Sequence, residues 1–161
     1  MATPGYLWMK DEHGQLIKSI SMVAGREGSA EVYSARHRVS IPTDSHTGSL
    51  TGTRRHDPFV IVKSFCSATP ILNKACCSGK TLQEVKVCWY RINQNGKEEE
   101  YFRQTLNQVK VVAVMPMVID IKDPAKEGYG HLEEVHFRYE KIQWLYLDGN
   151  IATEDEWKER A

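Results

Sequence analysis

Hydrophobic and polar residues alternate along most of the chain, a pattern typical of β-strands that bury one face. The alternating segments are rich in β-branched and aromatic residues, and turn-forming residues separate them. They span residues 6–10, 31–41, 59–65, 84–92, 99–106, 108–119 and 132–147. The pattern predicts a mainly β protein.

Turns and irregularities can be placed within this pattern. Asn95-Gly96 predicts a hairpin with a primed turn, whose central residues have positive φ, and Asp148-Gly149 predicts a second turn. The segment 132–147 changes phase, which predicts a bulge or bend near Glu140-Lys141. Pro116 cannot donate to a neighbouring strand, so we expect it on an edge or at a bulge.

One short segment departs from the strand pattern and predicts a helix over residues 70–78. Thr69 is placed to cap it, Pro70 suits its first position and Gly79 suits its end. The apolar residues at helical spacing are Ile71, Leu72, Ala75 and Cys76. We expect this helix to flank or plug a closed or nearly closed sheet.

Length and charge limit the class of protein. The 161 residues suit a single domain over 1–161, in which 151–161 is a short tail, a loose arm or a short helix, with no effector extension after it. Lys and Arg number 21, as do Asp and Glu, so the charge balance favours no nucleic-acid partner. The sequence has no signal-peptide pattern and no apolar run long enough for membrane insertion. These features predict a cytoplasmic chain that can leave the cell only by an unconventional route.

The candidate chemistry is sparse. The four cysteines, Cys66, Cys76, Cys77 and Cys88, lack the spacing of a zinc site, and we expect reduced, mostly buried thiols. We expect no metal and no cofactor. An enzyme could use His37, His46 or His56 with a carboxylate such as Asp44 or Asp57, although no catalytic motif supports this alternative.

The connection from Thr43 to His56 is unusually long for a link between strands, and such links tend to be functional or disordered. Hydroxyl residues alternate with glycine and leucine in it, which would suit a protruding β-extension, and Arg54 and Arg55 could meet carboxylates of another subunit. A floppy surface loop is the other interpretation.

Four blocks, in this order, resemble the Hcp family, the tube protein of the type VI secretion apparatus. They read IPTDSHTGSLTGTRRHDPFVIVKS, SATPILNKACCSGKTLQEVKVCWYRIN, EYFRQTLNQVKVV and DIKDPAKEGYGHLEEVHFRYEKIQWLYLDGN. The resemblance runs from about Tyr6 to Asn150. It implies two antiparallel sheets forming a β-barrel with one flanking helix, and no enzyme activity.

The resemblance also implies an assembly and a fate. Hexameric rings would stack into a tube inside a sheath, with a spike protein at the tip, and would be expelled into the medium or a target cell carrying effector cargo. The family's extended loop, which contacts other subunits or stacked rings, matches residues 43–56. The residues carried over are Asp44, Thr47, Gly48, Leu50, Thr51, Gly52, Arg54, Arg55 and His56.

The strand over 31–41 offers a candidate channel wall. In it Val32, Ser34, Arg36, Arg38 and Ser40 alternate with a more apolar set, so we expect them to face water. Ser34, Arg36 and Arg38 could then contact cargo, or could merely decorate an outer face. A binding module or chaperone that holds effectors without polymerising is a further alternative.

Overall fold

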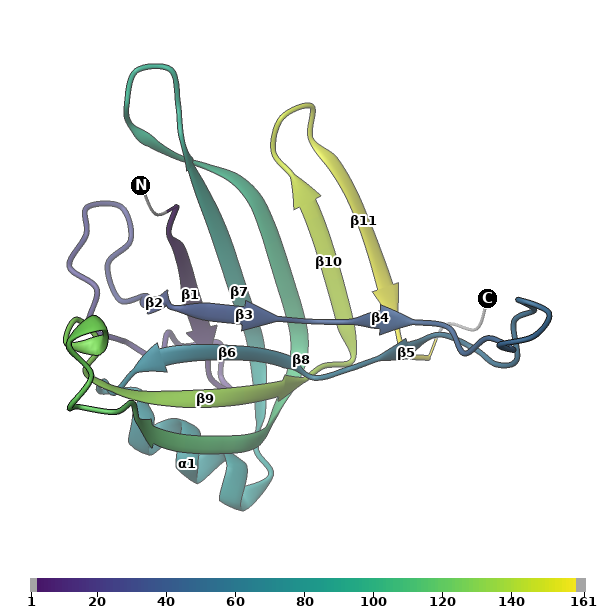
Figure 1. The fold of residues 1–161 in the computed structure, drawn as a ribbon, viewed down its shortest axis with the longest axis horizontal. Coiled ribbons are helices and arrows are strands. Elements are labelled where there is room, and N and C mark those ends of the chain that lie inside the picture. Colours follow the sequence, from purple (N-terminus) through teal and green to yellow (C-terminus); the bar gives the residue numbers. More distant parts are fainter. Residues whose placement is uncertain (1–2, 159–161) are drawn as a thin grey trace.

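The computed structural model describes residues 3–158, and strands dominate them (Figure 1). The strands are β1 (Gly5–Lys10), β2 (Ala30–Val32), β3 (Ser34–Arg36), β4 (Val39–Ser40), β5 (Arg55–His56), β6 (Phe59–Ser64), β7 (Thr81–Ile92), β8 (Glu98–Val118), β9 (His131–Arg138), β10 (Lys141–Tyr146) and β11 (Ile151–Glu156). The helices are α1 (Thr69–Ser78) and the short 3-10 helix η1 (Pro124–Lys126). The predicted fold class is confirmed.

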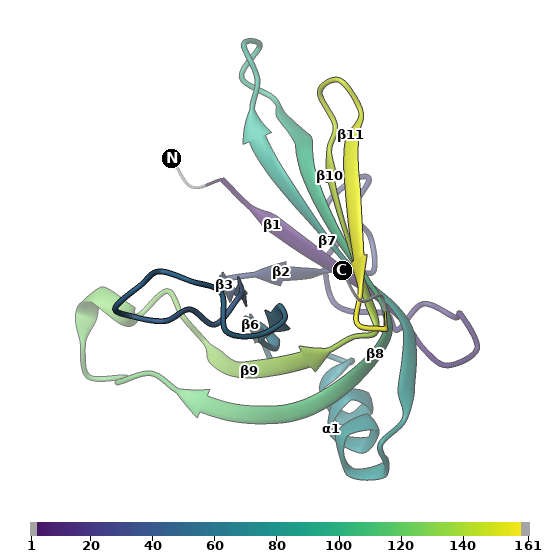
Figure 2. The same cartoon turned by 90° about the vertical axis from the view of Figure 1, so that its right-hand side faces the viewer.

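The strands pair in antiparallel fashion in the order β2-β1-β7-β8-β9-β6-β3, with β10 bound to β8 and β11 to β10, and a separate pair β4-β5. Figure 2 shows two layers, one containing β1, β7, β10 and β11 and the other β6, β9 and the second half of β8. Leu7, Val87, Phe59 and Phe137 are among the residues buried in the core between the layers. Leu72 and Ala75 of α1 pack against the same core, so the helix flanks the barrel as predicted.

The long strand β8 joins the two layers. Residues 98–110 pair with β7, whereas residues 110–118 pair with β9. The sequence predicted two strands here, but β8 continues through Gln108, whose φ of 52° is unusual for a residue with a side chain, and bends there. Pro116 lies where β8 has only β9 beside it among the described strands, so the predicted edge position is confirmed.

The bend predicted near Glu140-Lys141 is also confirmed. β9 ends at Arg138 and β10 begins at Lys141. Val135 and Phe137 before the bend and Ile142 after it are all fully buried, so the change of phase keeps both strands facing the core.

One of the two turn assignments needed correction. Among the described residues other than glycine, only Gln108 and Asn150 have positive φ, so Asn95-Gly96 does not form the expected primed turn. Gly96 alone is left-handed, with φ 73°, and the side chain of Asn93 accepts the N–H groups of Asn95 and Lys97. This asparagine stabilises a longer turn than the dipeptide pattern suggested.

The helix begins and ends almost where the sequence placed it. Gly79 caps the end in the left-handed conformation (φ 66°) and Pro70 lies in the first turn. Ala68, however, takes the N-cap position that we assigned to Thr69. The Thr69 hydroxyl instead accepts the N–H of Cys66 and donates to Glu133, because Thr69 is already the first helical residue.

The segment 31–41 is not one strand. It divides into β2, β3 and β4, which pair with β1, β6 and β5 in turn, because the chain crosses from one layer to the other and then leaves the barrel. The phase changes at Tyr33, so Val32 is buried and the expectation that it faces water is wrong. Ser34, Arg36 and Arg38 are exposed, as expected.

The expectation of a loose or helical tail is wrong for residues 151–156. They form β11, whose register with β10 runs from Tyr146 opposite Ile151 to Lys141 opposite Glu156. The turn through Gly149 (φ 82°) returns the chain along the free edge of β10. Backbone hydrogen bonds to β10 hold these residues in a strand although their sequence lacks the apolar alternation of a strand. Residues 159–161 of the predicted tail lie outside the described residues.

Candidate functional site

The chain between β4 and β5, residues 41–54, forms an arm that extends from the barrel along the longest axis of the molecule (Figure 1). Its two sides continue the β4-β5 pairing: the Thr51 N–H donates to the Pro42 carbonyl at 2.9 Å, and Thr43 pairs with Leu50. The long connection is therefore a β-like extension, one of the two forms that its composition allowed.

Asp44 organises the tip of the arm. Its carboxylate accepts the N–H of His46 at 2.7 Å and of Thr47 at 3.0 Å, and its carbonyl accepts the N–H of Gly48 at 2.9 Å. These backbone donors lower the pKa of the Asp44 carboxyl, because they favour its charged form. Gly48 has a φ of 74°, a conformation that glycine adopts without strain.

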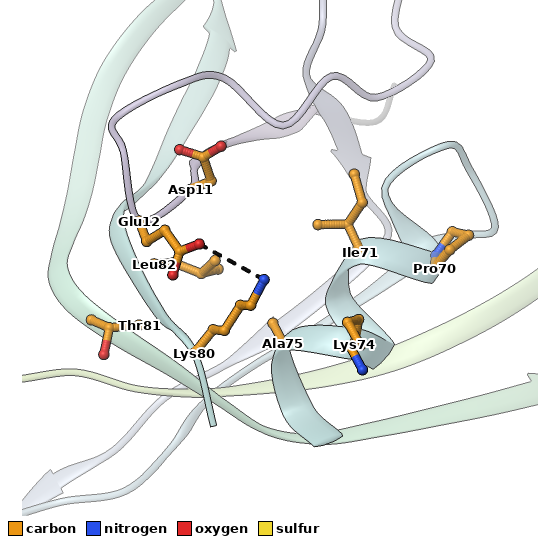
Figure 3. A pocket seen from close by; sticks show the side chains of 9 residues that line it. All are labelled: Asp11, Glu12, Pro70, Ile71, Lys74, Ala75, Lys80, Thr81 and Leu82. Atoms are coloured by element: carbon orange, nitrogen blue, oxygen red, sulfur yellow. Dashed lines mark ion pairs between the residues drawn. The ribbon is translucent and has the colours of Figure 1, made fainter. Parts of the chain in front are cut away.

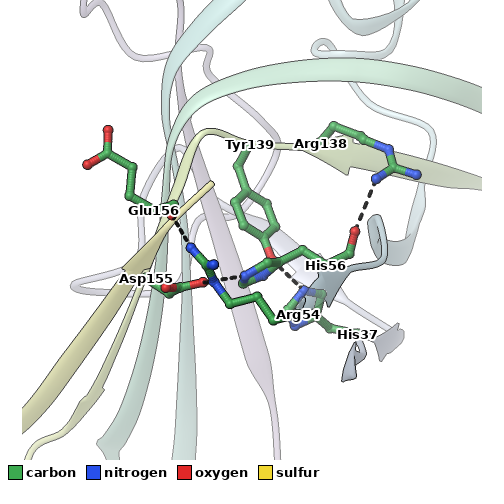
Figure 4. A network of polar contacts seen from close by, with 7 residues as sticks. All are labelled: His37, Arg54, His56, Arg138, Tyr139, Asp155 and Glu156. Atoms are coloured by element: carbon green, nitrogen blue, oxygen red, sulfur yellow. Dashed lines mark hydrogen bonds and ion pairs between the residues drawn. The ribbon is translucent and has the colours of Figure 1, made fainter. Parts of the chain in front are cut away.

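A partly buried polar cluster, which we call the anchor, holds the base of the arm (Figure 4). Its members are His37, Arg54, His56, Tyr139 and Asp155. The Tyr139 hydroxyl lies 2.7 Å from His37 Nε2 and 2.6 Å from His56 Nδ1. The other nitrogen of His56 lies 2.5 Å from a carboxylate oxygen of Asp155, to which Arg54 Nε also donates at 2.5 Å.

Backbone and ring contacts complete the anchor. The Arg54 guanidinium donates to the carbonyl of Glu156 at 2.5 Å, and that of Arg138 donates to the carbonyl of His56 at 3.0 Å. The ring of Trp157 packs on His56, which is only 3% exposed. The arm is thus fastened to the end of β9 and to β11.

Burial and neighbouring charges set the protonation of the anchor. Burial lowers the pKa of His37, with the nearby His56 acting in the same direction. Burial, followed by the Asp155 charge, raises the pKa of Tyr139. For Asp155 burial alone would raise the pKa, but hydrogen bonds from Arg54 and His56 outweigh it and lower the pKa. At neutral pH the anchor therefore contains an ionised carboxylate and a protonated phenol.

Apart from Asp44, at the tip of the arm, the loop residues chosen from the sequence fall into two groups. The exposed ones on the arm and at its base are Thr47, Gly48, Leu50, Thr51, Gly52 and Arg55. Arg54 and His56 instead turn inward, and the carboxylate that Arg54 meets belongs to Asp155 of its own chain. Sequence reasoning missed Tyr139 and Asp155 as partners of His37 and His56, because no local pattern links positions so far apart.

The three candidate channel residues share one exposed surface. Arg36 and Arg38 line a shallow hollow of about 350 Å³ together with Asp57, Val60 and His136. Glu134 lies 3.5 Å from Arg36 and 2.9 Å from His136, so part of the positive charge here is balanced.

A second hollow of about 330 Å³ lies between α1 and residues 11–12 (Figure 3). Ile71, Ala75 and Leu82 give it apolar walls, and Lys80 forms an ion pair with Glu12 at 3.7 Å. Within residues 3–158 no group of histidine, cysteine or acidic residues is arranged to hold a metal ion. The same residues include no helix that is both long and apolar enough to cross a membrane.

Residues 6–146 match the model of the family described as "Type VI secretion system effector, Hcp". The chain belongs to the Hcp family. The predicted membership is confirmed, and with it the expectation of a secreted protein of type VI secretion.

Hcp relatives cover nearly the whole chain. The Major exported protein of Pseudomonas aeruginosa is 33% identical over 98% of this chain and 97% of its own. A variant of Hcp1 from E. coli EAEC 042 has a TM-score of 0.88 and 47% identity, covering 97% of this chain and 99% of its own. The secreted protein Hcp3 from Pseudomonas aeruginosa has a TM-score of 0.77 and 29% identity, over 98% and 100% of the two chains.

Proposed function

We propose that this Hcp protein is a structural subunit of the type VI inner tube, which forms hexameric rings that stack and are expelled together with the spike. The braced arm is the observation that carries this proposal. An exposed polar segment loses conformational entropy when it is ordered, and in a single chain the arm itself buries little in return. An anchor that keeps such an arm extended is explained if the arm contacts another copy.

A stacked tube requires each ring to offer one face to a different face of the next ring, a contact that propagates instead of closing. The arm supplies a projecting element for such a face, with Leu50 66% exposed. Elsewhere Ile20, Met22, Val118 and Ile121 are also exposed apolar residues. Such side chains suit burial between copies.

The experiment that tests the assembly is native mass spectrometry of the purified protein, with negative-stain images of the same sample. We expect a dominant hexamer and ring-shaped particles. A persistent monomer at micromolar concentration would contradict the tube-subunit proposal.

The arm is tested by Leu50→Asp, with Leu50→Met as the matched control. Because Leu50 is exposed and distant from the anchor, we expect both variants to fold and form hexamers. In concentrated samples, only Leu50→Asp should reduce the fraction of stacked rings, by about tenfold, which corresponds to about 1.4 kcal/mol of contact free energy. Equal stacking of both variants would remove the arm from the ring-to-ring contact.

We further propose that Ser34, Arg36 and Arg38 lie on the channel wall and contact effector cargo. Their shared exposure and the hollow beside Arg36 and Arg38 support this role. Reversing both charges with Arg36→Glu and Arg38→Glu should change cargo co-purification while leaving rings intact. The control reverses two exposed lysines elsewhere, Lys122→Glu and Lys126→Glu, and unchanged cargo in the first variant would overturn this role.

The hollow also favours a second function, an effector-binding module or chaperone that never polymerises. This function needs the surface formed by Ser34, Arg36 and Arg38, but it does not need the arm to contact another ring. Cargo binding by a protein that stays monomeric would favour it, whereas sheath and spike partners are expected only for the tube subunit.

A further inference from the structure

A second buried polar cluster lies at the start of α1, apart from the anchor. Lys63 and Glu133 are directly opposite each other in the β6-β9 pair, both are 0% exposed, and they form an ion pair. The Lys63 ammonium also lies 3.2 Å from the sulfur of Cys66. The half-buried thiol of Cys66 is therefore in direct contact with a buried positive charge.

Several donors surround the same sulfur. The backbone N–H of Ala68, at the N-terminus of α1, interacts with it, and the Ser19 hydroxyl lies beside it. Ser19 Oγ is buried, and among the described residues no group forms a hydrogen bond with it at ordinary geometry. It is nevertheless close enough to the Cys66 sulfur to favour the thiolate form. Burial alone would raise the pKa of Cys66, but Ser19, Ala68 and Lys63 together outweigh it and lower the pKa.

An unsatisfied carboxylate oxygen completes the cluster. Glu133 Oε1 is bound by Lys63 and by the Thr69 hydroxyl, the latter at 2.9 Å. Glu133 Oε2 is buried and has no partner within the described residues. Buried acceptors are normally hydrogen-bonded, so this oxygen can accept one further donor. Hydrogen peroxide is the size of two water oxygens and both donates and accepts.

We propose that Cys66 is a modification site, a thiolate that hydrogen peroxide oxidises to sulfenic acid in the exported protein. The thiolate sulfur attacks one peroxide oxygen, so that the S–O bond forms as the O–O bond breaks. The hydroxide that leaves takes one proton from solvent and departs as water. Sulfur loses two electrons and peroxide gains them. Lys63, Ala68 and Ser19 stabilise the attacking thiolate. The inference does not depend on ring stacking.

The chain contains two matched controls. Cys77 is exposed on α1, so it is the more accessible thiol. Cys88 is buried, and burial followed by Glu100 raises its pKa to about 12, so it should remain a thiol. If accessibility alone governed oxidation, Cys77 would react first.

The test treats the native protein with hydrogen peroxide in the presence of dimedone, which traps sulfenic acids, and measures each labelled cysteine by peptide mass spectrometry. We expect Cys66 to be labelled at least tenfold faster than Cys77, and Cys88 to be labelled least. Labelling of Cys66 at or below the rate of Cys77 would overturn the proposal.

A paired variant tests the cause of the reactivity. Lys63→Met combined with Glu133→Gln removes both buried charges together, which avoids leaving one of them unpaired. In this variant the labelling of Cys66 should fall to about that of Cys77. If the variant does not fold, the pH dependence of wild-type alkylation by iodoacetamide decides: the Cys66 rate should level off below pH ~8.5, the ordinary thiol value. A profile that still rises through that pH would exclude a stabilised thiolate.

Discussion

The Tyr139 hydroxyl joins the two histidines of the anchor. The hydroxyl can donate a hydrogen bond to the ring nitrogen of one histidine and accept one from the ring N–H of the other. His37, Tyr139, His56 and Asp155 therefore form a continuous chain of hydrogen bonds only if one imidazole carries a proton on the nitrogen that faces the tyrosine. The side chains of three separate segments thereby fix the direction in which the arm leaves the barrel.

Removing this hydroxyl should destabilise the protein. Tyr139→Phe leaves the ring packing in place but leaves His37 Nε2 and His56 Nδ1 without their partner. We expect the free energy of unfolding to fall by about 1–3 kcal/mol, measured by urea denaturation. Tyr129→Phe is the control, because Tyr129 is 51% exposed, and it should change stability by less than ~0.5 kcal/mol. Equal effects of the two variants would mean that the anchor contributes little.

Acid should weaken the same cluster. The pKa of folded His37 is below the ordinary ~6.5, so as pH falls below that value the unfolded chain takes up a proton that the folded chain resists. Stability should therefore decrease from pH ~6.5 down to the folded pKa of His37. Asp155, whose pKa is lowered, adds a further loss only at lower pH, as its folded carboxylate becomes protonated.

The pH effect is measured by denaturation at neutral pH and at about pH 5.5, below the ordinary pKa of histidine. His37→Gln should show a smaller loss of stability than the wild type between these values, whereas His46→Gln, on the exposed arm, should behave like the wild type. An unchanged slope in His37→Gln would show that this histidine does not sense acid in the anchor.

At the scale of elements, the sequence predicted the strands with their own alternating pattern and failed where pairing was decided elsewhere. β6, β7 and the bend before β10 follow from local periodicity, as does α1. β11 could not be predicted, because residues 151–156 are polar and mostly exposed and become a strand only by pairing with β10. The arm could be recognised as an extension, but its anchor combines residues about a hundred positions apart.

Deleting β11 tests its structural role. Truncation after Asn150 removes the strand that pairs with β10 and also Asp155, the carboxylate that holds Arg54 and His56. We expect a clear loss of thermal stability and faster hydrogen exchange at the Thr51 and Asp44 amides of the arm. A chain truncated after Lys158 retains both features, together with the contact of Trp157 with His56, and is the control. A dispensable tail would give the two truncations the same stability.

At the scale of the whole molecule, equal numbers of acidic and basic residues allow many copies to pack without summed repulsion. Lys and Arg total 21, as do Asp and Glu. In the proposed assembly, exposed apolar residues such as Met22, at 89% exposure, would contribute to contacts between copies by burial and not by long-range charge.

The salt dependence of assembly follows from this balance. Raising ionic strength from about 0.05 M to about 0.5 M shortens the Debye length severalfold and would weaken an interface based on exposed ion pairs. We expect the hexamer fraction, measured by native mass spectrometry after rapid exchange or by light scattering, to change less than about twofold. Dissociation at high salt would show that charge pairing between subunits dominates.

The anchor also imposes an order in time. Arg54 is synthesised 101 residues before its partner Asp155. A growing chain on the ribosome has therefore made the arm long before the residues that brace it, and local contacts form before such distant ones. Until β11 has been made, the nascent chain lacks the contacts that hold the arm, so the ring-to-ring contact proposed above would require a completed subunit.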